Sequence, residues 1–82
     1  MITSGQIKAA RALIGMTATK LAELSDVAYT TVVRMESSKG IPLGQVKTLD
    51  AVQKVLEEAG IEFIGTPESG AGVRWRPSRS SI

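Results

Sequence analysis

The side chains best suited to contact a ligand lie between Tyr29 and Arg34, in a stretch predicted to be helical. At about 100° per residue, four of them share one face of that helix: Tyr29, Thr30, Val33 and Arg34. Such a face can donate hydrogen bonds, make apolar contacts and carry positive charge. The sequence therefore indicates a binding surface, and the elements around it must hold that surface in place.

Leu21 to Glu36 is predicted to form two short helices joined by a tight turn. The first spans about 18–24, the turn is Ser25-Asp26-Val27, and the second begins at Ala28 or Tyr29 and ends near Glu36. A helix of this length is not stable alone in water. We therefore expect Val32 and Met35, on the face opposite Tyr29, to hold the second helix against a core.

Two further helices are expected to supply that core. The first runs through 6–13, is capped by Thr3 or Ser4 and ends at Gly15. Its apolar stripe is Ile7, Ala10, Leu13 and Ile14. The longest helix runs from Leu43 or Gly44 to Ala59, after a loop at 37–42. Its stripe follows the three-and-four spacing of a buried face: Val46, Leu49, Val52, Leu56 and Ala59.

After Gly60 the apolar period changes from 3.6 to 2, which predicts strands at 61–64 and 73–76. A loop rich in glycine separates them, so we expect an antiparallel hairpin with Glu62 opposite Arg74 or Arg76. The last residues, 77–82, have no periodicity and are expected to be disordered. The chain thus divides into a helical domain at 1–60, a hairpin extension at 61–76 and a tail.

The hairpin is also the expected homodimer interface. Two strands leave both sheet edges unpaired, and Ile64 and Trp75 have little core left to cover them in a chain of 82 residues. Pairing across a two-fold axis would cover the edges and these side chains together. The alternative is that Trp75 packs on the long helix of its own chain.

Composition argues against an enzyme. The chain has no Cys and no His, so it offers no disulfide, no thiolate metal ligand and no imidazole base. Neighbouring carboxylates such as Glu57 and Glu58 face different ways on a helix, so they do not form a metal site. Gly70 and Gly72 do not precede a helix, so they do not form a phosphate-binding loop. We expect no metal, no cofactor and no catalytic residue. No apolar run approaches the length of a membrane span, so we expect a protein of the cytoplasm.

The stretch LAELSDVAYTTVVRME resembles the helix-turn-helix of the Xre/Cro/phage-repressor family, and the resemblance extends over roughly residues 5 to 60. The positions that fit are Leu21, Ala22, Val27, Thr31, Val32, Arg34, Met35 and Glu36. Asp26 stands where the family usually has Gly, at a position that tends to need positive φ. Ala28 replaces the usual Ser or Thr cap, and Ala18 replaces a frequent Gln. The tail resembles small Xre-like proteins that close with Gly-Val-Glu-Phe-Ile and a Gly-Val-Arg segment.

This resemblance implies a mainly α fold, with a four-helix lambda-repressor-like domain before the hairpin. It also implies a small transcriptional regulator, a repressor, that binds double-stranded DNA with the helix at 28–36 in the major groove. Base contacts would come from Tyr29, Thr30, Val33 and Arg34, and backbone contacts from Thr17, Thr19, Lys20, Ser37 and Lys39. In similar repressors an arginine at the position of Arg11 pairs with the glutamate that ends the recognition helix, here Glu36. The alternative is an exposed Arg11.

Charge supports DNA binding only locally. The net charge is +2, but residues 1–39 carry five cations against three anions, and residues 40–82 carry five against five. The cations of the first half lie on or beside the two short helices. An antitoxin with the same core, a protein-interaction module that has lost DNA binding, and a helical hairpin without a ligand stay open as alternatives.

Overall fold

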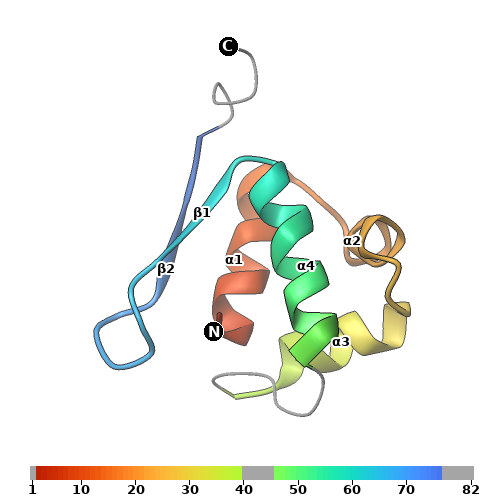
Figure 1. The fold of residues 1–82 in the computed structure, drawn as a ribbon, viewed down its shortest axis with the longest axis horizontal. Coiled ribbons are helices and arrows are strands. Elements are labelled where there is room, and N and C mark those ends of the chain that lie inside the picture. The colour runs from red at the N-terminus through yellow and green to blue at the C-terminus, as the bar shows by residue number, and fades with distance from the viewer. Residues whose placement is uncertain (1, 40–45, 77–82) are drawn as a thin grey trace.

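The structure, a computed structural model, describes residues 2–39 and 46–76. Its elements in chain order are α1 (Ser4–Ile14), α2 (Ala18–Ser25), α3 (Tyr29–Ser37), α4 (Val46–Glu58), β1 (Ile61–Ile64) and β2 (Gly72–Trp75). The expected mainly helical class with a C-terminal hairpin is confirmed (Figure 1). The expected start of the long helix at Leu43 or Gly44, residues 40–42 of the preceding loop and the tail at 77–82 lie outside the described residues.

One apolar core joins the helices and the hairpin. The largest fully buried side chains come from all four helices and from β1: Ile7, Leu21, Val32, Val52, Leu56 and Ile61. Each contributes about 1.5–3 kcal/mol relative to exposure in water. Phe63 and Val73 pack against the same core from the two strands. The hairpin therefore shares its core with the helices instead of standing apart from them.

Local capping sets the limits of the first two helices. Thr3 Oγ1 accepts from the backbone N–H of Gln6 at 3.1 Å, and Gln6 Oε1 accepts from the N–H of Thr3 at 2.8 Å. This reciprocal capping box starts α1. Gly15 ends it in the left-handed conformation with φ 67°. Thr17 then starts α2 by accepting from the N–H of Lys20 at 3.0 Å.

The hairpin is antiparallel, and its register pairs Ile61 with Trp75, Glu62 with Arg74, Phe63 with Val73 and Ile64 with Gly72. Strand β2 begins one residue earlier than expected, at Gly72. Gly65, with φ 77°, has no room for a side chain because a Cβ there would collide with the carbonyl oxygen of Gly70. The close approach at the loop thus requires glycine.

Two members of the expected apolar stripes are exposed. Leu13 is 44% exposed, because it lies about 100° from Ile14 around α1 and the core packs against the side that carries Ile7, Ala10 and Ile14. Val46 is 66% exposed, because it is the first residue of α4 and lies on the outer margin of the stripe formed by Leu49 and Val52. Within the described residues, no helix has both the length and the apolar character needed to cross a bilayer.

Candidate functional site

Helix α3 has one buried face and one exposed face. Val32 is fully buried and Met35 is 8% exposed, so both hold the helix against the core as expected. On the other side, Tyr29 is 52% exposed and Val33 is 40% exposed. Thr30 and Arg34 are exposed too. The four side chains predicted to form a binding surface are therefore accessible together on one helix.

The turn between α2 and α3 sets the direction in which α3 leaves. Asp26 adopts the left-handed conformation, with φ 58° and ψ 42°, as expected for the position where the resembling family has glycine. The N–H of Val27 donates to Ala22 O at 3.0 Å, and Ser25 Oγ donates to Leu21 O at 2.6 Å. Val27 packs against the core. The turn is therefore fixed by one backbone bond, one side-chain bond and an apolar contact.

The C-terminal end of α3 is tied to α1 by an ion pair. Arg11 Nε donates to Glu36 Oε2 at 2.6 Å and its second nitrogen donates to Glu36 Oε1 at 2.7 Å. The remaining guanidinium nitrogen donates to Met16 O at 2.9 Å. The pKa of Arg11 is raised, first by its hydrogen bond to Glu36 and then by that carboxylate's charge, and partial burial opposes the rise. Arg11 is therefore a structural residue that orients α3, and it is not the exposed arginine of the alternative.

The residues expected at a DNA backbone lie at the start of α2 and at or just beyond the end of α3. All five are exposed: Thr17, Thr19, Lys20, Ser37 and Lys39. Two of their hydroxyl groups already make internal bonds. Thr17 Oγ1 accepts from Lys20 N, so its own proton is available to a phosphate. Ser37 Oγ donates to Val33 O at 2.8 Å, so this hydroxyl can accept a bond but has no proton left to donate.

Acidic and apolar groups border the same surface. A shallow hollow of about 390 Å³ lies at the junction of the two helices and is lined by Thr19, Ala22, Glu23, Asp26, Val27, Ala28 and Tyr29. Leu24, on α2, is 51% exposed.

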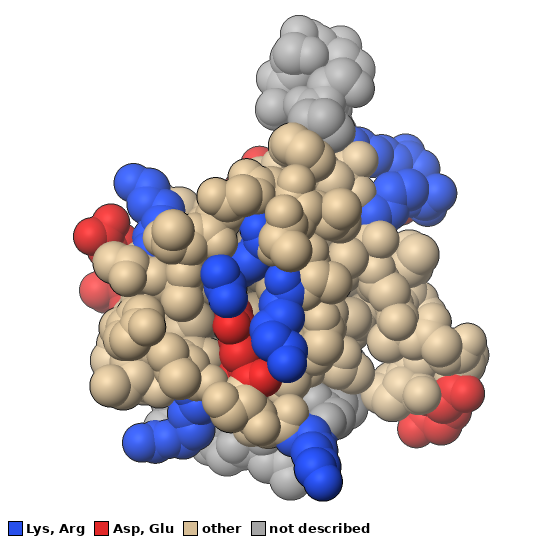
Figure 2. All heavy atoms as spheres, turned by 180° about the vertical axis from the view of Figure 1, so that it is seen from behind, with Lys and Arg blue, Asp and Glu red and all other residues tan. Residues whose placement is uncertain are grey.

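Figure 2 shows that the lysine and arginine side chains on the face turned away from Figure 1 form separate groups, with acidic side chains beside the central one. That face does not carry one continuous basic patch.

The two residues expected at a dimer interface are on the hairpin. Ile64 and Trp75 are each 40% exposed. The indole N–H of Trp75 donates to Ala59 O at 3.2 Å, just beyond the end of α4. Trp75 therefore has a hydrogen-bond partner within its own chain and retains an exposed part. The homodimer interface stays a prediction.

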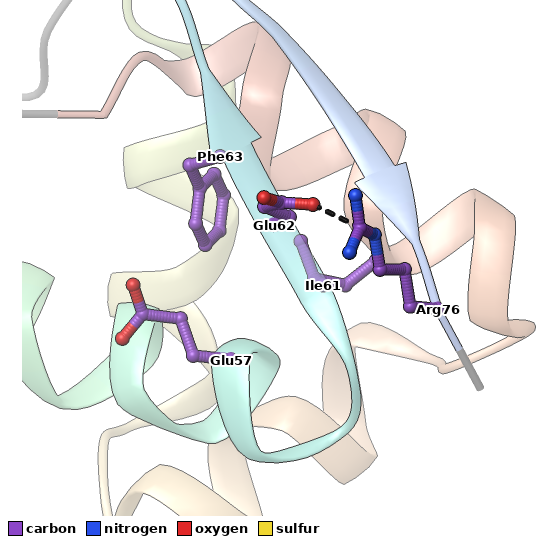
Figure 3. A pocket seen from close by; sticks show the side chains of 5 residues that line it. All are labelled: Glu57, Ile61, Glu62, Phe63 and Arg76. Carbon is purple, nitrogen blue, oxygen red and sulfur yellow. Dashed lines mark ion pairs between the residues drawn. The ribbon is translucent and has the colours of Figure 1, made fainter. Parts of the chain in front are cut away.

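Glu62 and two arginines form a charged cluster on the outer face of the hairpin. Arg74 Nε and Arg76 Nε both lie 3.0 Å from the same oxygen, Glu62 Oε1. Figure 3 shows Glu62 reaching toward Arg76, whereas Phe63 and Glu57 lie on the other side of β1. A hollow of about 530 Å³ is lined by Glu57, Ile61, Glu62, Phe63 and Arg76.

Gln6 is a structural residue that the sequence analysis did not identify. Its Nε2 donates to Ile64 O at 3.2 Å and to Gly72 O at 2.9 Å, while its Oε1 completes the capping box. One side chain thus joins the start of α1 to both strands. The signal for its capping role was the Thr3-x-x-Gln6 spacing; nothing in the sequence indicated the bond to the hairpin.

A scan against protein-family models found no matching family, and a search of curated proteins found no match.

Proposed function

We propose that the four helices form a lambda-repressor-like helix-turn-helix domain, and that the protein is a small transcriptional repressor that binds double-stranded DNA. The observation that carries the proposal is the exposed face of α3. It holds a guanidinium, hydroxyl groups and an apolar side chain, and within residues 2–39 and 46–76 no carboxylate pairs with Arg34. In this proposal α3 lies in the major groove.

Base recognition would come from the exposed face of α3. Arg34 has a planar fork of N–H donors that matches the O6 and N7 acceptors of guanine. Val33, 40% exposed, has the character and size to contact a thymine methyl group. Tyr29 and Thr30 lie in the first turn of α3 and supply hydroxyl groups for bases or phosphates. Each good bidentate contact discriminates against a wrong base by about 1–3 kcal/mol.

Backbone contacts would come from the two ends of the surface. Lys20 and the hydroxyl proton of Thr17 lie at the start of α2, and Thr19 is beside them. Lys39 follows the end of α3 and is exposed. Such contacts fix the position of a protein on the duplex without reading its sequence. Ser37 would take part only by accepting a hydrogen bond, for example from a water molecule that bridges it to a phosphate, because its own proton is used within α3.

The decisive experiment is selection of bound sequences from a random DNA pool, followed by measurement of affinity over a range of salt concentrations. We expect a defined sequence to be enriched, and the logarithm of its affinity to fall linearly with the logarithm of salt, because cations that contact phosphates release counterions. An unchanged pool after several rounds would exclude sequence-specific binding. The matched control is Lys54→Ala on α4, which removes an exposed charge outside the proposed surface.

A second candidate function is a protein-interaction module that has lost DNA binding; an antitoxin, in contrast, would keep the DNA-binding core and neutralise a partner through its tail. Leu24 is 51% exposed, about as much as Tyr29. This exposure favours the second candidate, because an apolar side chain on α2 adds nothing to phosphate binding. Glu23 and Asp26 in the adjoining hollow would also repel phosphates. The two functions differ in salt dependence: a protein partner held by apolar contacts would bind almost equally well at low and moderate salt.

A further inference from the structure

The outer edge of β2 has unpaired backbone groups. Arg76 N donates to Gly60 O at 2.9 Å, so residues 60 and 76 form a hydrogen-bonded pair of the sheet. Because hydrogen-bonded pairs alternate in an antiparallel sheet, the pairs 62–74 and 64–72 are also bonded. The N–H and C=O groups of Val73 and Trp75 therefore point away from β1. In the described part of the chain nothing accepts or donates to these groups.

The side chains beside this edge carry excess positive charge. Arg74 and Arg76 are about half exposed, and both direct Nε to the same oxygen of Glu62. One carboxylate thus serves two guanidinium groups, and most of their N–H donors are left for another partner. The two arginines are separated by one residue, so both project from the same face of the sheet about 7 Å apart. A strand added next to β2 would meet them with alternate side chains.

We propose that β2 is a docking edge for an extended acidic segment of another protein, one with carboxylates at every second residue and apolar residues between them. The backbone of the segment would pair with Val73 and Trp75, as in β-strand addition. Its carboxylates would lie beside Arg74 and Arg76, and the exposed part of Trp75 would contact its apolar residues. The arginines of β2 would then lie between two acidic groups, Glu62 on β1 and the carboxylates of the added strand.

A second copy of the chain fits this edge less well. If two copies of β2 overlapped fully in antiparallel orientation, Arg74 would lie opposite Arg74 or Arg76 of the second copy, and like charges directly opposite are destabilising. The acidic segment avoids this repulsion. The docking edge is also independent of the proposed DNA surface, because α1 and α4 lie between the hairpin and α2 (Figure 1).

The experiment uses the full chain and a synthetic five-residue probe, acetyl-Val-Glu-Val-Glu-Val-amide. Trp75 is the sole tryptophan, so its fluorescence reports events at this edge directly. We expect a saturable fluorescence change and binding heat with this peptide. We expect at least about tenfold weaker binding when lysine replaces both glutamates, and the same loss when the amides that would bond to β2 are N-methylated.

The protein variants test the arginines. Arg74→Gln with Arg76→Gln should weaken binding of the acidic peptide about tenfold, and Lys47→Gln with Lys54→Gln, an equal charge change on exposed residues of α4, should not. Circular dichroism establishes that each variant folds. Equal binding of the lysine peptide or of the N-methylated peptide would overturn the proposal, as would no binding at all. Sedimentation that shows a dimer dissociated by the acidic peptide would also overturn it, because the edge would then belong to a second copy.

Discussion

Arg11 pairs with Glu36 on the inner side of α3, whereas Arg34 belongs to α3 and projects from its outer face, and the environments of the two arginines differ completely. At the junction of α1 and α3, the guanidinium of Arg11 makes three hydrogen bonds, two to Glu36 and one to Met16 O. On the outer face of α3, Arg34 has no ion-pair partner among the described residues. A net charge counts the two arginines equally. Their surroundings assign one to stability and leave the other available to a ligand.

The hairpin arginines lie between these extremes. Arg74 and Arg76 share one carboxylate and keep donors free. An exposed pair of this kind contributes at most about 1 kcal/mol to stability, so releasing it to a partner costs little. Substitution of Arg11 should therefore change folding stability, and substitution of Arg34 should change binding.

The largest expected effect is on stability at the α1–α3 junction. Arg11→Ala leaves Glu36, whose side chain is 9% exposed, without its cation. We expect the free energy of unfolding to fall by about 3 kcal/mol, near the lower end for a broken buried pair because Arg11 itself is 22% exposed. Urea denaturation followed by circular dichroism measures this change.

The double variant Arg11→Met with Glu36→Met is the control for that measurement. Replacing both partners with apolar side chains removes the pair without leaving a buried charge, and we expect most of the lost stability to return. If Arg11→Ala alone changed the free energy of unfolding by less than 0.5 kcal/mol, about the size of an ordinary surface substitution, the pair would not hold α3 in place.

The next effect is on binding at the exposed face. Arg34→Ala should weaken DNA binding by about 1–3 kcal/mol per half-site and relax preference at one base position. Its stability should stay within about 0.5 kcal/mol of the original chain, because the bond from Ser38 Oγ goes to the backbone oxygen of residue 34, which alanine keeps. Anisotropy titrations with the selected DNA and single-base variants of it measure both quantities. Wild-type affinity together with wild-type preference would remove Arg34 from base recognition.

The two ends of α3 also differ, and a gain in stability can test this. Its C-terminal end is tied by Arg11 and Glu36, but Ala28 at the N-terminal end makes no side-chain capping bond. Ala28→Ser would supply an acceptor for an N–H of the first turn and should stabilise the protein by about 1 kcal/mol. Ala28→Val, which supplies no acceptor, is the control in the same denaturation experiment. Equal midpoints for Ser and Val would mean that the N–H groups are already satisfied by water.

Local signals in the sequence were sufficient for most of the fold. Gly15 and Thr17 mark the break between α1 and α2, and Asp26 occupies the left-handed turn expected of it. These features depend on neighbouring residues alone, so the sequence carries them directly. The hairpin followed from its change of period, although β2 begins at Gly72, one residue early.

Features that depend on distant contacts were not predictable. Gln6 bonds to carbonyls 58 and 66 residues away, which no local pattern encodes. The exposure of Leu13 depends on which side of α1 the hairpin and α3 cover. At the site, the sequence predicted that α3 exposes Val33 and Arg34. The bond from the Ser37 hydroxyl to Val33 O was not predicted either, although it is local and spans only four residues. Periodicity identifies which residues share a helix face, but tertiary packing determines which residues at the margin of that face are buried.

The smallest effect expected is that of Lys39, which follows α3 and is exposed. If its ammonium group contacts a phosphate, Lys39→Ala should weaken binding to every DNA sequence about equally and lower the salt slope by about one per subunit. Arg34→Ala, in contrast, should change the ranking of sequences. The matched control is Lys47→Ala, an equal loss of charge on α4, which should leave the slope unchanged. Equal slopes for Lys39→Ala and the original chain would show that Lys39 does not reach the DNA backbone, and would confine the proposed backbone contacts to the start of α2.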